Sequence, residues 1–176
     1  NENKFLVKTY RVGLITELKN QGFELILSDK FQKFWEQIST FSTTSDGVDI
    51  PKGVNAEFRE YQVKGFHWLW FLYQYGLNGI LADDMGLGKT LQALSLLQKA
   101  KEEDGPMPTL VVAPTTVVFN WEAEIQKFTP ELSCLKLSGA DRKTLFKHIP
   151  EYDIVITSYA LVRRDIAKLK KYNFRY

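Results

Sequence analysis

The stretch GILADDMGLGKT, residues 79–90, combines residue types that bind phosphate groups. Residues 79–82 form a short apolar run that predicts a buried strand, and residues 83–88 are too rich in Gly and Asp to continue it. A helical pattern then opens with Lys89 and Thr90. The backbone N–H groups of such a loop and of the first helical turn can converge on an anion, because they have no partners inside the helix. Lys89 can reach the β- and γ-phosphates of a nucleotide, and the Thr90 hydroxyl can ligate Mg²⁺.

The glycines and aspartates of this loop act differently toward an anion. Gly86 and Gly88 allow positive φ angles and a close approach of the backbone to a ligand. The carboxylates of Asp83 and Asp84 would repel phosphate unless they point away, so we expect them to cap the turn. The full phosphate-loop pattern G-x-x-x-x-G-K-[ST] also has Gly where Asp83 stands. This departure argues against a GTPase or small-molecule kinase and favours a helicase-like variant.

Composition narrows the class of protein. The chain has 176 residues, of which 44% are hydrophobic, which is enough for the core of one domain with an appendage. A net charge of +2 permits contact with nucleic acid without requiring it. The sequence contains no uncharged apolar run of membrane-spanning length and starts with nothing like a signal peptide, so we expect a soluble intracellular protein without a membrane partner. Cys134 is the only cysteine and lies in a strand-like segment, which predicts a buried, unreactive thiol.

The elements that must position the loop alternate between strands and helices. Strands are predicted at 79–82, 109–113, 134–137 and 153–158, and helices at 55–75, 89–102, 116–128, 141–148 and 159–171. Continuous apolar strands alternating with helices predict an α/β fold, a parallel sheet with helices on both faces. Ligands of such sheets bind at the carboxyl ends of the strands.

The first fifty residues have a different pattern. Their apolar spacing predicts a small α+β region, with strands at 4–10 and 23–27, helices at 12–21 and 28–41, and a polar connector at 41–53. We therefore divide the chain into 1–50, the tail of an upstream α+β region, and 51–176, the first part of the nucleotide-binding lobe.

Four motifs, in order, resemble those of the Swi/Snf-type (switch/sucrose non-fermenting) ATPases of helicase superfamily two. They are FREYQ (58–62), ILADDMGLGKTLQAL (80–94), LVVAPTTVVFNWEAEIQKF (110–128) and YDIVITSYALVRRDI (152–166). In the first motif, Glu60 stands where the family usually has Pro. The resemblance implies a partial RecA-like P-loop lobe, the first of two, in an ATP-dependent double-stranded-DNA translocase. It also implies a DNA-dependent ATPase that uses ATP and Mg²⁺, and the compact lobe favours a bacterial member.

The resemblance also implies which residues bind the nucleotide. The amide of Gln62 carries a donor and an acceptor, so it can pair with the edge of adenine; without the motif it would be a helix-surface glutamine. Arg59 would either lie near the nucleotide or cap the helix. The full nucleotide-binding set is Arg59, Gln62, Met85, Gly86, Leu87, Gly88, Lys89, Thr90 and Leu91. Within it, Lys89 and Thr90 are the candidate catalytic residues and Thr90 is the candidate metal ligand.

Two hydroxyl-bearing loops follow predicted strands. By resemblance to the family, Pro114, Thr115, Thr116, Thr157 and Ser158 hold DNA phosphates without reading the base sequence. The alternative is that Thr116 and Ser158 only cap the helices that follow them.

Two other features are interpreted as part of the fold and not of a binding site. Trp121 has the spacing of a buried helix face, which favours core packing over base stacking. The basic residues of 163–171 are expected to form a solvated face, with a DNA patch as the alternative.

The resemblance places motif II, with its Asp-Glu pair, after the segment NFRY (173–176). We therefore expect this chain to be a fragment that hydrolyses ATP negligibly by itself. One alternative is a non-catalytic nucleotide-binding scaffold or interaction module, in which residues 1–50 bind a protein partner. Another is a true unwinding helicase. The expected location is cytoplasmic, nucleoid-associated in a bacterium or nuclear in a eukaryote.

Overall fold

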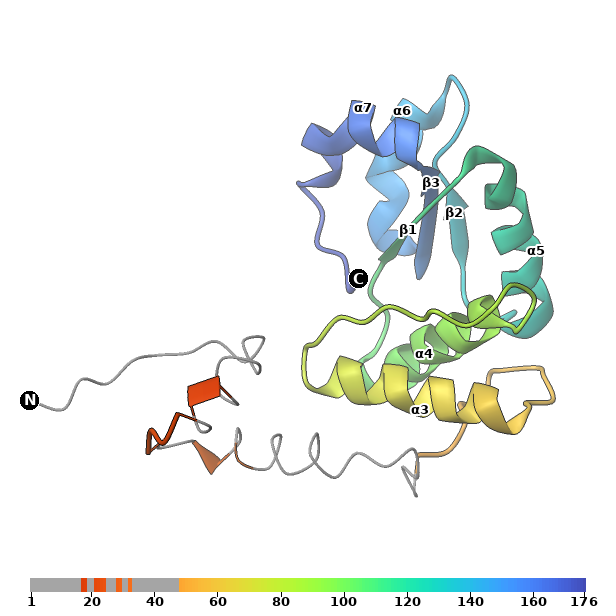
Figure 1. Ribbon diagram of the computed structural model, residues 1–176. Helices are drawn as coiled ribbons and strands as arrows, with labels where there is room; N and C mark the ends of the chain where they lie inside the picture. Colours follow the sequence, from red (N-terminus) through yellow and green to blue (C-terminus); the bar gives the residue numbers. More distant parts are fainter. Residues whose placement is uncertain (1–16, 19–20, 25–27, 30–31, 33–47) are drawn as a thin grey trace, which may run out of the picture.

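The computed structural model of the chain describes residues 17–18, 21–24, 28–29, 32 and 48–176 (Figure 1). The elements predicted before residue 48 therefore lie mostly outside the described residues. The described part contains α3 (Glu60–Gln74), α4 (Lys89–Asp104), β1 (Thr109–Ala113), η1 (Thr115–Val117), α5 (Val118–Phe128), β2 (Cys134–Lys136), α6 (Arg142–Leu145), η2 (Phe146–Glu151), β3 (Ile154–Ser158) and α7 (Tyr159–Leu169). In this part of the chain, no helix has the length and apolar character needed to cross a bilayer.

The sheet has three parallel strands in the order β1-β3-β2. Ile154 of the central strand is aligned with Thr109 on one side and with Cys134 on the other. All five residues of β3 are buried, which fits a continuous apolar strand covered on both faces. The prediction of an α/β fold with a parallel sheet is confirmed, and three of its four predicted strands are present.

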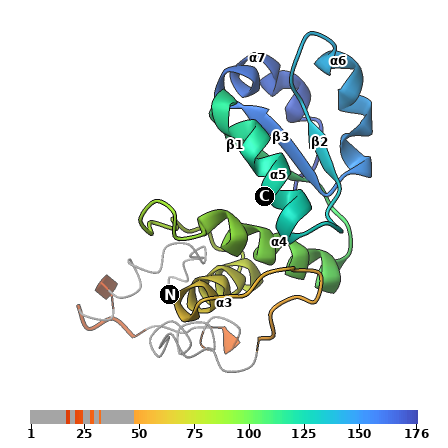
Figure 2. The ribbon, with the colours of Figure 1, turned by 90° about the vertical axis from the view of Figure 1, so that its right-hand side faces the viewer.

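Helices cover both faces of this sheet, as Figures 1 and 2 show. On one face, Leu94 of α4 and Ile125 of α5 pack with Ile156 of β3. On the other face, Val155 of β3 packs in a cluster with Leu169, the last residue of α7. The alternation of residues 155 and 156 between two cores is the period-2 geometry of a strand.

Helix α3 lies against α4 on the side away from the sheet (Figure 2). It begins at Glu60, although the pattern predicted a start near residue 55. Asn55 is held outside the helix because its N–H donates to the Phe128 carbonyl at 2.7 Å. The first turn is then closed at Arg59, whose N–H donates to Oε1 of Gln62 at 3.0 Å.

Two of the later helices are interrupted by tighter turns. The predicted helix 116–128 is a 3-10 turn, η1, followed by α5. The predicted helix 141–148 is one turn of α6 followed by η2, which contains Pro150. Proline has no N–H to donate in an α-helical turn, so the segment cannot continue as a regular α-helix.

The prediction of a strand at 79–82 is wrong for this structure. The segment belongs to no strand, and Ile80 is 87% exposed. The free edge of β1 is instead contacted by the C-terminal residues. Arg175 N–H donates to the Pro108 carbonyl at 2.7 Å, and Leu110 N–H donates to the Tyr176 carbonyl at 2.9 Å. An apolar run becomes a strand only where a neighbouring strand accepts its hydrogen bonds.

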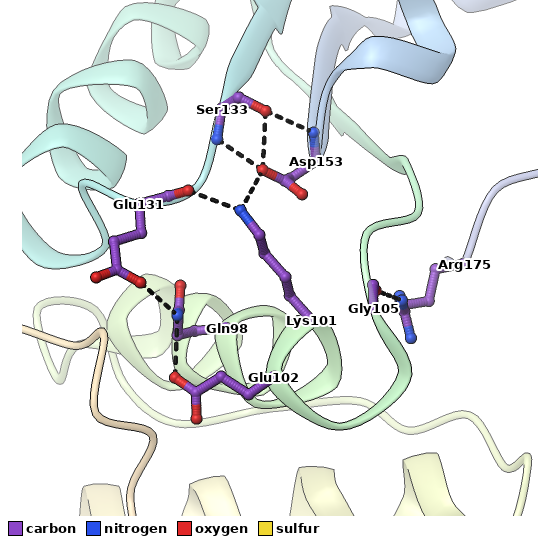
Figure 3. A network of polar contacts seen from close by, with 8 residues as sticks. All are labelled: Gln98, Lys101, Glu102, Gly105, Glu131, Ser133, Asp153 and Arg175. Carbon is purple, nitrogen blue, oxygen red and sulfur yellow. Dashed lines mark hydrogen bonds and ion pairs between the residues drawn. The ribbon is translucent and has the colours of Figure 1, made fainter.

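A polar network fixes the C-terminal half of α4 to the starting end of the sheet (Figure 3). Nζ of Lys101 lies 2.9 Å from Oδ2 of Asp153 and also donates to the Glu131 carbonyl. The same carboxylate oxygen accepts hydrogen bonds from the backbone N–H and the hydroxyl of Ser133. Burial opposes ionisation of Asp153, but these hydrogen bonds outweigh it and hold the pKa of the carboxyl below its ordinary value.

We expect Asp153→Asn to lower the free energy of unfolding by about 2 kcal/mol at pH 7, because it removes a charged acceptor of several hydrogen bonds. A lowered native pKa gives stability that is present above the unfolded pKa and is lost as pH falls through the native value. The difference between the two proteins should therefore shrink as pH falls below about 4. Urea titrations at pH 7 and pH 3 measure the free energy of unfolding of the parent and the variant. An equal loss of stability at the two pH values would contradict the role assigned to the Asp153 carboxylate.

Candidate nucleotide-binding site

The loop before α4 has the backbone geometry of a phosphate cradle. Gly86 and Gly88 have φ angles of 83° and 79°, in the left-handed region that the sequence predicted for them. Gly88 is the N-cap residue of the 16-residue helix α4 and makes no side-chain cap. The first-turn N–H groups of α4 therefore keep no side-chain partner at their N-cap, and the positive end of the helix dipole stands behind them.

Lys89 places its ammonium inside this loop. Its Nζ donates to the carbonyl of Asp83 at 2.6 Å and to the carbonyl of Asp84 at 2.7 Å. The amine thus curls back over the loop instead of extending away from it. Thr90 follows in the first turn of α4 and is half-buried.

Gln62 of α3 lies next to the loop. Its Nε2 donates to the Leu87 carbonyl at 3.1 Å, and a Cβ on Gly88 would come within 2.5 Å of the same nitrogen. The structure therefore brings the predicted adenine-binding glutamine and the phosphate loop together, although the rest of α3 and an extended segment separate them along the chain. Both ends of the amide are engaged, because Oε1 accepts from Arg59 N–H.

The remaining residues of the predicted nucleotide-binding site differ in how exposed their side chains are to solvent. Met85 is 96% exposed at the tip of the loop, whereas the side chain of Leu91 is buried. Leu91 can thus contribute only its backbone to a ligand. Arg59 is exposed and occupies the N-cap position of α3, but its side chain makes no cap hydrogen bond, so both of its predicted roles stay open.

The expectation that the loop carboxylates cap the turn does not hold for Asp83. Its Oδ2 accepts a hydrogen bond from Nε2 of Gln92 at 3.2 Å. The carboxylate therefore points toward the buried side of α4 and not to the turn backbone. Sequence reasoning did not single out Gln92. Its signal was available, since Gln92, Ser95 and Gln98 are the polar residues of the otherwise apolar stretch 91–98 of α4, and all three are buried.

The predicted DNA-contact residues lie together at the carboxyl ends of β1 and β3. The register aligns Ala113 with Ser158, so the turn that follows β1 lies beside the start of α7. Thr115 and Thr116 are exposed in η1. Thr157 is buried, and its hydroxyl donates to the Leu137 carbonyl at 3.1 Å, so that hydroxyl serves the sheet. Pro114 is exposed at the start of the turn.

The helix-capping alternative fits the position of buried Ser158 but not that of Thr116. The N-cap of α5 is Val117 and not Thr116. Ser158 does stand at the N-cap of α7, but its side chain makes no cap hydrogen bond. The N-terminus of the 11-residue helix α7 is therefore without a side-chain cap beside the exposed threonines.

Three further predictions concern residues outside the site. Trp121 is partly buried and packs against the core cluster between α4, α5 and β3, as predicted. Cys134 is only half-buried, not fully buried as predicted. Its burial, with a smaller contribution from Glu122, still raises the pKa of the thiol to about 11, which agrees with an unreactive cysteine. The basic side chains of 163–171 are exposed, as a solvated face requires.

The residues present fit a nucleotide phosphate and its metal ion. A loop with two left-handed glycines, an ammonium held over it and an uncapped helix N-terminus offers donors and positive charge to an anion. The Thr90 hydroxyl, one residue after Lys89, is the group that would hold Mg²⁺. The arrangement favours triphosphate binding and does not by itself supply a general base.

A parallel sheet covered on both faces, preceded by a glycine loop that opens a helix, defines a RecA-like P-loop ATPase lobe. A family model described as the SNF2-related domain matches residues 61–176, and the chain belongs to this family. This result confirms the Swi/Snf-type resemblance drawn from the four motifs.

Individual relatives agree with this assignment. The chain is 44% identical over 142 residues to the chromatin-remodeling ATPase INO80 of Sclerotinia sclerotiorum, covering 73% of this chain and 8% of the relative. It is 36% identical over 162 residues to the TATA-binding protein-associated factor mot1 of Schizosaccharomyces pombe, covering 84% and 8%. The Sulfolobus solfataricus SWI2/SNF2 ATPase core in complex with dsDNA superposes with a TM-score of 0.68 at 40% identity, covering 73% of this chain and 26% of that one.

These relatives bear on how much of a full-length protein the chain represents and on its predicted bacterial origin. The chain spans about 8% of the length of the curated relatives that it matches. Both of those relatives are fungal, so the prediction of a bacterial member has no support.

Proposed function

We propose that the protein containing this chain is an ATP-dependent translocase on double-stranded DNA, and that residues 51–176 supply the first part of its first ATP-binding lobe. The observation that carries the proposal is the loop at residues 83–88, whose glycines have positive φ and whose carbonyls hold the Lys89 ammonium.

In this proposal each residue of the loop has a separate task. The amides around Gly86 and Gly88 bind the phosphates, and Lys89 neutralises charge on the β- and γ-phosphates. Gln62 connects α3 to the loop through Leu87, so it can couple recognition of the base to the position of the phosphates. Thr90 holds Mg²⁺, which when bound stabilises the charge that develops on the transferred phosphoryl group.

The edge formed by the ends of β1 and β3 is the proposed DNA contact. Exposed Thr115 and Thr116 offer hydroxyl groups, and the neighbouring N-terminus of α7 offers N–H donors. Donors of this kind bind phosphates of any base sequence, which suits a protein that moves along a duplex. The solved SWI2/SNF2 core with dsDNA supports duplex DNA as the partner. A relative named as a chromatin-remodeling ATPase supports a nuclear location over a cytoplasmic one.

The test is ATP turnover by the purified full-length protein with and without DNA. We expect duplex DNA to stimulate hydrolysis and a DNA-bound triplex strand to be displaced in the presence of ATP, whereas the two strands of a simple duplex stay paired. Strand separation would favour the unwinding helicase. ATP binding without any turnover would contradict the proposal and favour the non-catalytic scaffold.

A further inference from the structure

Gln92 is a fully buried amide directly behind the phosphate loop. It lies three residues after Lys89 on α4, has no exposed surface, and donates from Nε2 to Oδ2 of Asp83 at 3.2 Å. This hydrogen bond joins the helix that follows the loop to the residue that begins the loop. Burying an amide side chain costs free energy unless hydrogen bonds compensate for the lost water.

The other end of the amide fixes its direction. Oε1 of Gln92 is buried without a hydrogen-bond partner among the described residues, and it faces α3 at Gly65. A Cβ at Gly65 would lie 1.8 Å from this oxygen, so only glycine leaves room for it there. If the amide were turned over, Oε1 would face the Asp83 carboxylate, and two acceptors would oppose one another. The observed orientation therefore leaves one acceptor unsatisfied in order to present N–H to Asp83.

The consequence of this bond is seen at Lys89. The ammonium contacts the backbone carbonyls of Asp83 and Asp84, and among the ion pairs of the described residues it forms none with either carboxylate. Because Nζ of Lys89 lies 2.6 Å from the Asp83 carbonyl oxygen, a rotated Asp83 side chain would come near the ammonium. Its carboxylate is instead turned toward Gln92.

We propose that Gln92 is a positioning residue that holds the Asp83 carboxylate away from the phosphate-binding ammonium of Lys89. The proposal rests on the nucleotide-binding function proposed above. A carboxylate free to rotate would compete with phosphate for the ammonium and would add negative charge beside the ligand. Gly65 is part of the same arrangement, because it makes room for the amide between α3 and α4.

The experiment is equilibrium binding of a fluorescent ATP analogue with Mg²⁺ to the full-length protein. Gln92→Leu keeps the approximate volume of the side chain and removes its donor. We expect the dissociation constant to rise about tenfold, which corresponds to about 1.4 kcal/mol. The matched control is Gln98→Leu. Gln98 lies on the same helix, is 1% exposed, and its Oε1 likewise has no partner among the described residues. Its Nε2 donates to Glu102 and Glu131 instead of the loop. Its dissociation constant should stay within about twofold of the parent protein.

A second substitution separates positioning from packing. If Gln92 acts by restraining a carboxylate, then Asp83→Ala in the Gln92→Leu background should restore most of the lost affinity. A packing defect would give a double variant that binds no better than the single one, and this result would overturn the proposal. Equal weakening by Gln98→Leu would overturn it as well.

Two further outcomes are informative. If Gln92→Leu does not fold, Gln92→Asn keeps the amide but shortens its reach by one methylene, and it should show the same loss and the same recovery with Asp83→Ala. Failure of Gln92→Asn to weaken binding would overturn the proposal. If the parent protein itself does not bind the analogue, the nucleotide-binding function fails and this inference fails with it. If the parent protein binds the analogue and Gln92→Leu has the same dissociation constant, only the inference about Gln92 is rejected.

Discussion

Lys89→Ala is expected to lower DNA-stimulated ATP turnover of the full-length protein by at least about 10²-fold. The ammonium of Lys89 is held over the phosphate loop by two backbone carbonyls, at 2.6 Å and 2.7 Å. The substitution removes a positive charge that is already held at the phosphate loop. Within the described part of the chain, this ammonium donates only to loop carbonyls. Because those carbonyls belong to a largely exposed loop, the fold should lose little stability.

A matched lysine on the same helix gives the control. Lys99 lies ten residues further along α4, pairs with Glu103 at 2.8 Å and contacts the face of Trp70. Lys99→Ala removes the same charge from the same helix but far from the loop, so turnover should stay within about twofold and only stability should fall. Steady-state hydrolysis with saturating duplex DNA measures both variants. Turnover by Lys89→Ala within about threefold of the parent protein would reject the role assigned to the loop.

The parts of the fold that could be predicted are those in which the local pattern and the tertiary environment agree. The run at 153–158 is apolar, short and bounded by turn residues, and it forms the buried central strand β3. The run at 79–82 has the same local character but forms no strand, because the edge of β1 is contacted by Arg175 and Tyr176. Pairing is decided by the rest of the chain, and no local pattern contains that information.

The candidate site shows the same division. The phosphate loop could be predicted because each residue type has a local geometric reason, and Gly86 and Gly88 have the positive φ angles that this reasoning requires. The orientation of Asp83 could not be predicted, because it depends on a hydrogen bond to Gln92 and on the space left by Gly65 in another helix. The proximity of Gln62 to the loop came from the motif order and not from the spacing alone.

The second large effect concerns the ion pair between Arg142 of α6 and Asp165 of α7. Nε of Arg142 lies 2.7 Å from Oδ2 of Asp165, a second guanidinium nitrogen lies 3.4 Å from Oδ1, and a third donates to the Gly139 carbonyl. Both side chains are buried, at 9% and 10% exposure. We expect Arg142→Met to lower the local stability of α6 and α7 by about 3–5 kcal/mol at pH 7, because it leaves a buried carboxylate without its partner.

Hydrogen exchange of peptides from α6 and α7 in the full-length protein measures this loss, and peptides from α4 serve as the internal control. Arg142→Met combined with Asp165→Leu should recover most of the protection, since replacing both charges by apolar groups removes the unpaired carboxylate. If the double variant exchanges as fast as Arg142→Met alone, the loss comes from packing and not from the pair.

The pH dependence of the same variant follows from the carboxyl of Asp165. The hydrogen bond from Arg142 holds its pKa below the ordinary value, so in the parent protein the stabilisation is present above the unfolded pKa and is lost as pH falls through the native one. In Arg142→Met the carboxyl can relieve its burial by taking a proton. The deficit should therefore be largest near neutral pH and should shrink toward pH 4.

Because α7 begins directly after Ser158, beside the exposed threonines of η1, a loosened α7 should also weaken stimulation of the ATPase by DNA at pH 7. A variant with fast exchange in α7 but full stimulation by DNA would separate this helix from the proposed DNA contact.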